Sequence, residues 1–135
     1  MCLMIDEKKT EKFMKESDGD VKFYKVFVKS GSRLIPLYQI HLSYTEDIDE
    51  VGWATATPVE DEVDPGAVYG GAYHGYLEES RAKEVATFMK GARHRGSETV
   101  IRSVMVPSSS IVAVGREGDI AFTKMKVALE KGEKL

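Results

Sequence analysis

The sequence of 135 residues lacks several features that would by themselves indicate a function. It has one cysteine, Cys2, which excludes an internal disulfide and a thiolate metal cluster. No apolar run approaches the roughly 20 residues that a membrane-spanning helix needs. Charged residues follow Met1 too early for the apolar core of a secretory signal. We therefore expect a cytoplasmic protein that does not associate with membranes.

Familiar catalytic and phosphate-binding motifs are also missing. The sequence contains no Gly-x-Ser-x-Gly, no P-loop and no Rossmann fingerprint. Its three histidines, His41, His74 and His94, lack the spacing of metal ligands. From these motifs we expect neither a resident metal nor a resident cofactor.

Basic residues are absent from a long central part of the chain. Residues 34–80 contain no Lys or Arg and ten Asp or Glu, whereas the two flanking parts are mildly basic and the net charge is −3. This layout is typical of charged regions that solvate one monomer, but an acidic 46–64 region could also dock on a basic protein partner or mimic nucleic acid. Because an acidic middle repels phosphates, we do not expect nucleic-acid binding. Formation of a homo-oligomer stays open.

The composition and the residue patterns favour one α+β domain. The length suffices for a single core, and 42% hydrophobic with 30% charged residues is typical of globular proteins. We expect a short helix or a loosely attached arm in residues 1–19, one main helix at about 78–90 and a frayed tail at 130–135. Alternation predicts extended segments, namely 22–29, 33–44, 51–57, 67–76, 98–106, 111–114 and 120–129. The expected sheet is bent and mostly antiparallel, with six or seven short strands.

The first extended segment has two distinct faces. Its alternation separates two sets of side chains, namely Tyr24, Val26 and Val28 on one face, and Phe23, Lys25, Phe27 and Lys29 on the other. The turn at 30–32, centred on Gly31, predicts a hairpin with the run that follows.

The segment 70–76 is the strongest candidate for a site, because glycines, tyrosines and a histidine coincide there just before a helix. His74 could bind a ligand phosphate or act as an acid or base near neutral pH, or it could be tied to a neighbouring carbonyl. Tyr73 and Tyr76 could stack on a ring, or pack in the core and at its rim. Gly75 and the other glycines could admit a ligand close to the backbone, or permit a bulge.

Three arginines complete the predicted ligand site. Arg93 and Arg95 lie in a glycine-bounded turn that suits bidentate phosphate recognition, although a basic loop after a helix is also ordinary. Arg102 shares the apolar face of a predicted strand with Val100 and Val104. An arginine in such a place needs either a buried carboxylate or an anionic ligand.

Short motifs along the chain resemble those of small, mostly uncharacterised phage and bacterial proteins. The matching residues are Met1-Cys2-Leu3, Tyr24-Lys25-Val26, Gly71-Ala72-Tyr73-His74, 100–107 and 118–127. Ala72 is one residue more than the family has between the glycine and the aromatic. The resemblance implies a phage or prophage setting. We expect a binding module rather than an enzyme. This module would hold a small anionic, nucleotide-like ligand and would counter host defence by sequestering a host signalling molecule.

A looser likeness is to ADP-ribosyltransferases, which also run from a tyrosine-bearing strand through a strand-helix unit to a late catalytic glutamate. The residues that could occupy these positions are Tyr24, His74 and Glu117. The resemblance implies an alternative function as an enzyme that uses NAD, with these three side chains in the pocket.

Overall fold

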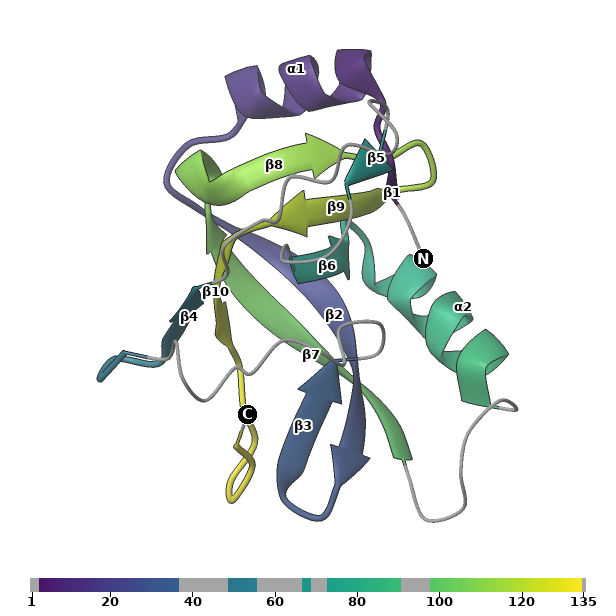
Figure 1. Cartoon of the computed structure of the whole chain (residues 1–135), viewed down its shortest axis with the longest axis vertical. Helices are drawn as coiled ribbons and strands as arrows, with labels where there is room; N and C mark the ends of the chain where they lie inside the picture. The colour runs from purple at the N-terminus through teal and green to yellow at the C-terminus, as the bar shows by residue number, and fades with distance from the viewer. Residues whose placement is uncertain (1–2, 37–48, 56–66, 69–72, 91–97, 135) are drawn as a thin grey trace.

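The computed structural model describes residues 3–36, 49–55, 67–68, 73–90 and 98–134 (Figure 1). Two α-helices and ten strands follow one another in these residues. Their bounds are β1 Leu3–Met4, α1 Glu7–Glu16, β2 Asp20–Ser30, β3 Arg33–Pro36, β4 Trp53–Thr55, β5 Ala67–Val68, β6 Tyr73–Tyr76, α2 Glu79–Lys90, β7 Glu98–Pro107, β8 Ile111–Val114, β9 Asp119–Phe122 and β10 Lys124–Val127. A single 3₁₀ turn, Ser108–Ser110, joins β7 to β8.

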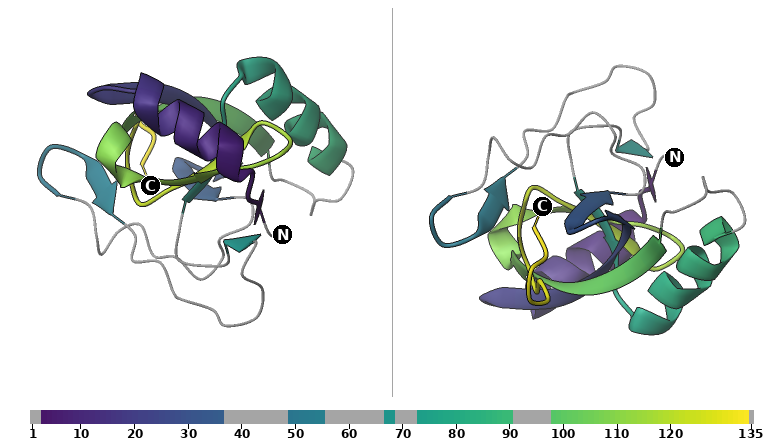
Figure 2. Two further views of the ribbon diagram at one scale, coloured as in Figure 1. Left: turned by 90° about the horizontal axis from the view of Figure 1, so that it is seen from above. Right: turned by 90° about the horizontal axis from the view of Figure 1, so that it is seen from below.

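Eight of the strands form one antiparallel sheet. Its order is β4-β10-β7-β2-β6-β9-β8, and β3 pairs with β2 beside this path. The longest pairing joins β2 to β7, from Asp20 opposite Pro107 to Lys29 opposite Glu98. The two remaining strands, β1 and β5, pair with each other. Because β2 and β7 are long and strongly curved, the sheet bends around its own interior (Figure 2).

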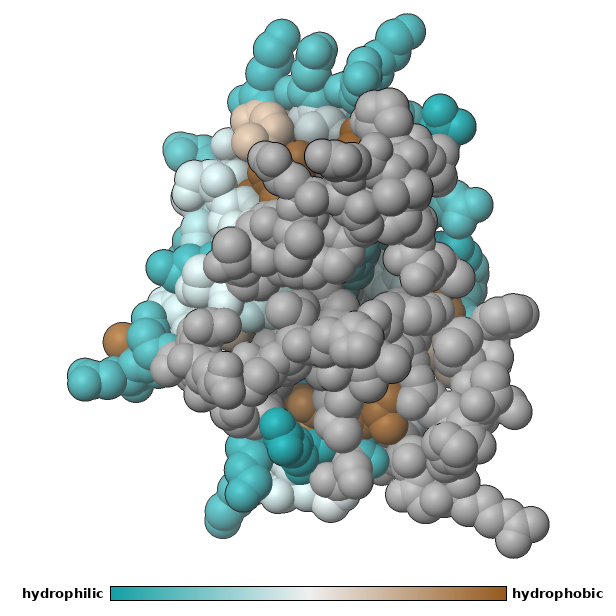
Figure 3. Space-filling model, in the orientation of Figure 1, coloured by the Kyte–Doolittle hydropathy of each residue, from teal (hydrophilic) through white to brown (hydrophobic). Residues whose placement is uncertain are grey.

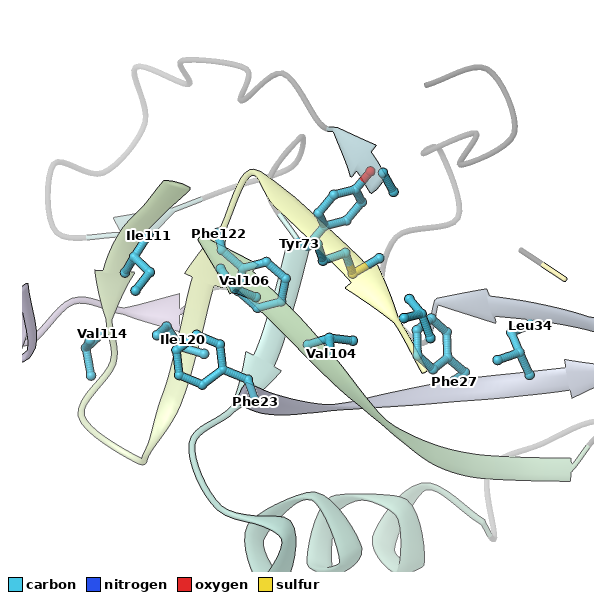
Figure 4. Close-up of a cluster of buried hydrophobic side chains, with 13 residues drawn as sticks. Phe23, Phe27, Leu34, Tyr73, Val104, Val106, Ile111, Val114, Ile120 and Phe122 are labelled. Carbon is cyan, nitrogen blue, oxygen red and sulfur yellow. The ribbon is translucent and has the colours of Figure 1, made fainter. Parts of the chain in front are cut away.

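One apolar core fills the inside of this bend. Its buried side chains come from β2, β3, β4 and β6 to β10, and those labelled in Figure 4 are Phe23, Phe27, Leu34, Tyr73, Val104, Val106, Ile111, Val114, Ile120 and Phe122. Burial of each Val, Leu, Ile, Phe or Met side chain in this core contributes about 1.5–3 kcal/mol to folding. We call the side of the sheet toward this core the interior face, and the opposite side the outer face.

The two helices cover different parts of the sheet. The carboxylate of Asp6 accepts a hydrogen bond from the backbone of Lys9 and caps α1, whose solvent side is hydrophilic (Figure 3). Phe13 of this helix packs on Phe23, with ring centres 5.7 Å apart, at one end of the core. The other helix, α2, lies outside the bend against β2, β6 and β7, where its Ala82 is fully buried (Figure 2).

The structure confirms the α+β fold, the main helix and the hairpin at Gly31, whose φ of +62° suits glycine. The predicted strand 120–129 is in fact two strands, because Thr123 interrupts it and its backbone N–H donates to the carbonyl of Ser110 at 2.9 Å. This break lets β9 pair with β6 and β8 while β10 pairs with β7 and β4. Of the predicted run 33–44, residues 37–44 lie outside the described part.

The prediction of a frayed tail at 130–135 is wrong for the residues that the structure describes. The backbone N–H of Lys134 donates to the carbonyl of Ser32, and its carbonyl accepts from Leu34, both at 2.8 Å. The side chain of Glu133 is only 2% exposed. The C-terminal segment therefore lies against the β2–β3 hairpin, held by backbone pairing that a local reading of its polar sequence does not reveal.

Candidate functional site

A pair of cationic side chains stands on the interior face of the sheet. Lys25 of β2 and Arg102 of β7 are direct cross-strand partners, so both project to the same side as Phe23 and Phe27. Lys29 lies four residues further along the same face of β2. We call Lys25, Lys29 and Arg102 the cationic cluster.

One carboxylate, that of Glu133, binds two members of this cluster. Arg102 donates to it through two nitrogens, at 2.9 Å from Nε to Oε1 and 2.6 Å from Nη2 to Oε2. The amine of Lys29 lies 3.1 Å from the same carboxylate, and Glu130 adds a longer contact of 3.4 Å to Arg102. The hydrogen bond from Arg102, foremost among several favourable contacts, lowers the pKa of Glu133 to about 2. Glu133 is therefore ionised throughout the physiological range.

The third member, Lys25, is buried at 3% exposure. Its amine donates to the backbone carbonyl of His74 at 2.7 Å and lies 5.8 Å from the centre of the Phe27 ring. Burial lowers the pKa of Lys25 from 10.5 to about 7. A large share of the molecules therefore carries a neutral Lys25 amine at physiological pH. Both Lys25 and Arg102 also interact with residues other than those named above.

The sheet divides the predicted ligand residues between its two faces. Tyr73 is 1% exposed and packs against Phe122 on the interior face, with ring centres 6.1 Å apart. Alternation along β6 places His74 and Tyr76 on the outer face, where both are partly exposed. Burial, followed by the charge of Lys25, lowers the pKa of His74 to about 4. His74 is thus neutral at physiological pH.

Arg102 lies on the interior face, as the pattern of β7 predicts, and the buried carboxylate that such an arginine needs is Glu133. Arg93 and Arg95 lie outside the described residues, as does most of the acidic region 46–64. The roles assigned to these residues remain predictions.

The three residues predicted for an NAD-using enzyme do not all lie in one place. Tyr24 pairs with Tyr76 across β2 and β6, which brings it to the outer face next to His74. Glu117 lies in the β8–β9 turn, 78% exposed, and forms an ion pair with Arg81 at 3.3 Å. It lines an open groove of about 360 Å³, whose other lining residues are Lys9, Leu77, Glu78, Ser80, Arg81, Glu84 and Gly118. Neither His74 nor Tyr24 lines this groove, and use of NAD stays a prediction.

Gly75 has a packing role that the sequence left open. A Cβ atom at this position would meet the carbonyl oxygen of Tyr24 at 2.9 Å and the ring of Phe122 at 3.2 Å. The missing side chain therefore lets β6 approach β2 closely. This approach is what places the His74 carbonyl within reach of the Lys25 amine.

Sequence reasoning missed Lys25, Lys29 and Glu133 as members of a site. The signal for Lys25 was present, because the residue shares a strand face with Phe23 and Phe27. For Glu133 no local signal existed, since its contact with Arg102 joins residues 31 apart in the sequence.

Neither helix of the described residues has the length and apolar character that crossing a membrane requires. The same described residues contain no group of three or more His, Cys, Asp or Glu arranged to hold a metal ion. No family model, curated protein or solved structure matches the chain.

Proposed function

We propose that this protein is a binding module for a small anionic ligand, which the cationic cluster on the interior face recognises. The observation that carries the proposal is the direct cross-strand pairing of Lys25 with Arg102. Glu133 compensates the charge of Arg102 in the free protein. A carboxylate or phosphate that contacts both side chains would be attracted by Arg102 and by the protonated form of Lys25, so the pairing favours an anion.

The contact with Glu133 indicates the kind of chemistry that the ligand would use. Arg102 presents its guanidinium as a two-pronged donor, and Lys29 adds a single charge beside it. A planar guanidinium group that donates two parallel hydrogen bonds suits carboxylates and phosphates alike. An external anion would contact Lys25 and share or replace the interaction of Arg102 with Glu133. In the phage setting that the resemblance implies, a host signalling nucleotide is the ligand class we favour.

Binding of an anion next to Lys25 is coupled to proton uptake. The pKa of Lys25 is about 7 without a ligand, and a nearby negative charge raises the pKa of an amine. The bound complex is therefore more fully protonated than the free protein. Affinity is highest below pH 7 and falls as the pH rises above that value.

Isothermal titration calorimetry against a panel of nucleoside monophosphates, nucleoside triphosphates and cyclic nucleotides tests the proposal. At pH 7 at least one of them should bind with proton uptake, detected as a dependence of the heat on the ionisation enthalpy of the buffer. Lys25→Met, which keeps the length of the side chain but removes its charge, should abolish this binding. Lys12→Met on the exposed side of α1 is the matched control and should bind as the wild type does.

Two results would overturn the proposal. One is a silent titration with every member of the panel. The other is unchanged affinity in a folded Lys25→Met protein, because the ligand would then lie elsewhere. Far-UV circular dichroism of the variant establishes that it is folded.

A further inference from the structure

One row of side chains crosses the outer face of four adjacent strands. The register places Trp53 opposite Lys126, Lys126 opposite Met105, and Met105 opposite Lys22. The row therefore runs across β4, β10, β7 and β2 in that order. With about 4.8 Å between neighbouring strands, its ends are about 14 Å apart.

Two further side chains extend this row on the same face. Lys124 lies two residues before Lys126 on β10, and Tyr24 lies two residues after Lys22 on β2, so alternation directs both outward. Their interior neighbours Ala54, Phe23 and Met125 are fully buried. We call Lys22, Tyr24, Trp53, Met105, Lys124 and Lys126 the outer-face strip.

The strip combines positive charge with partly exposed aromatic rings and one exposed apolar side chain. Lys22 and Lys126 are exposed, and Met105 is 38% exposed although it is a large apolar residue in a strand. The amine of Lys22 lies 5.6 Å from the centre of the Tyr24 ring, and that of Lys124 lies 5.4 Å from the centre of the Trp53 ring. Each ring thus has a lysine amine over its face, in a place that a flat group could take.

Acidic residues of the described part flank the strip at the start of β2 and just before β4. Asp20 is exposed at the start of β2. The backbone N–H of Trp53, with those of Val51 and Gly52, and the charge of Lys124 lower the pKa of Asp49. Asp49 thereby holds the turn that leads into Trp53. Glu50 follows Asp49 in the same turn, whereas the strip itself carries three lysines and no acid in a chain whose net charge is −3.

We propose that the outer-face strip binds single-stranded nucleic acid. Lysines at several points of the strip fit the phosphates of an extended strand, while the Trp53 and Tyr24 rings offer stacking platforms for its bases. A sheet surface that combines aromatic rings with lysines suits unpaired bases, because in a duplex the bases are stacked on one another and not accessible to such rings. This site is separate from the cationic cluster, which lies on the other face of the same strands. It departs from the expectation of no nucleic-acid binding that the acidic middle of the chain suggests, because the charge of the strip itself decides what binds there.

Trp53 supplies a direct probe, because it is the single tryptophan of the chain. Titration with 20-nucleotide oligo(dT), oligo(dA) and oligo(rU) at 50 mM salt should quench its fluorescence, with DNA and RNA measured in separate arms. Three phosphate contacts predict a slope of log Kobs against log salt of about −2. A duplex of the same length should bind more weakly and without quenching.

Two triple variants of equal charge separate the strip from general electrostatics. Lys22→Gln with Lys124→Gln and Lys126→Gln should lower the affinity about tenfold or more at 50 mM salt and flatten the salt slope. Lys8→Gln with Lys12→Gln and Lys15→Gln, all exposed on α1, is the matched control and should retain most of the affinity. Trp53→Ala should lower the affinity by a further factor of about ten through lost stacking.

Several outcomes would overturn the proposal. They are an unquenched Trp53 with all three single strands, equal binding of duplex and single strand, and an equal loss of affinity in the α1 control. Binding of heparin with the same affinity and no change at Trp53 would indicate a surface for polyanions in general, and would also count against it. Lys25→Met should leave oligonucleotide binding intact, so that failure here is distinct from failure of the small-ligand proposal.

Discussion

Replacement of Lys25 by methionine should stabilise the protein at neutral pH and lose this advantage as the pH rises. The pKa of Lys25 is about 7 in the folded protein and 10.5 ordinarily. The unfolded chain therefore binds one more proton between these values, and wild-type stability increases with pH across this window. Each pH unit is worth about 1.4 kcal/mol, so burial of the amine costs about 5 kcal/mol at pH 7 or below.

Methionine also removes something favourable. The hydrogen bond from Lys25 to the His74 carbonyl disappears, and a buried carbonyl without a donor costs about 1–3 kcal/mol. The expected net gain of Lys25→Met is therefore about 2–4 kcal/mol at pH 7. Between pH 7 and pH 9.5 this gain should shrink by about 1.4 kcal/mol per pH unit.

Urea unfolding of both proteins at several pH values between 7 and 9.5, followed by far-UV circular dichroism, measures this difference. Groups that titrate alike in both proteins cancel when the two free energies of unfolding are subtracted. Lys12→Met on the exposed side of α1 should show no pH-dependent difference. A difference between wild type and Lys25→Met that stays constant over this range would refute the reasoning, because Lys25 would then keep its charge inside the fold.

Two other predictions concern the strand that carries His74. Because burial lowers the pKa of His74 to about 4, the unfolded chain binds the extra proton as the pH falls from 6.5 to 4, and the fold should lose up to about 3 kcal/mol there. His74→Gln should remove this loss in urea unfolding at pH 4.5 and 6.5, and an unchanged difference between these pH values would contradict it. Gly75→Ala should cost about 1–3 kcal/mol, since its Cβ would lie 2.9 Å from the Tyr24 carbonyl oxygen. A thermal melt equal to that of the wild type would count against this packing role.

The sequence predicts most of the secondary structure because local periodicity suffices for it. Alternation in 22–29 and 98–106 marks the two longest strands, and helical spacing marks α2. The short strands β5 and β6, by contrast, occupy only parts of the predicted run 67–76, of which residues 69–72 lie outside the described part. Strand order was beyond reach, because it depends on contacts between distant segments.

The candidate site shows the same limit more sharply. The pattern of β7 predicts that Arg102 needs a buried carboxylate or an anionic ligand, and the structure supplies Glu133. No spacing in the sequence links Lys25 to Arg102, because their proximity follows from the register of β2 against β7. The sequence predicts one ligand site with both His74 and Arg102, but the registers of β6 and β7 against β2 place their side chains on opposite faces of the sheet.

The junction between β2 and β6 has a mechanical consequence. Among the described residues, β2 pairs with β7 over ten positions but with β6 at Tyr24 and Tyr76 alone. Next to this single rung, the Lys25 amine bridges the two strands by its contact with His74. Among the neighbouring strands of the sheet, β2 and β6 therefore share the fewest paired positions. The Lys25 amine is thus a side-chain link at the place where backbone pairing between two neighbouring strands is most limited, and whatever changes its charge acts directly on the contact between β2 and β6.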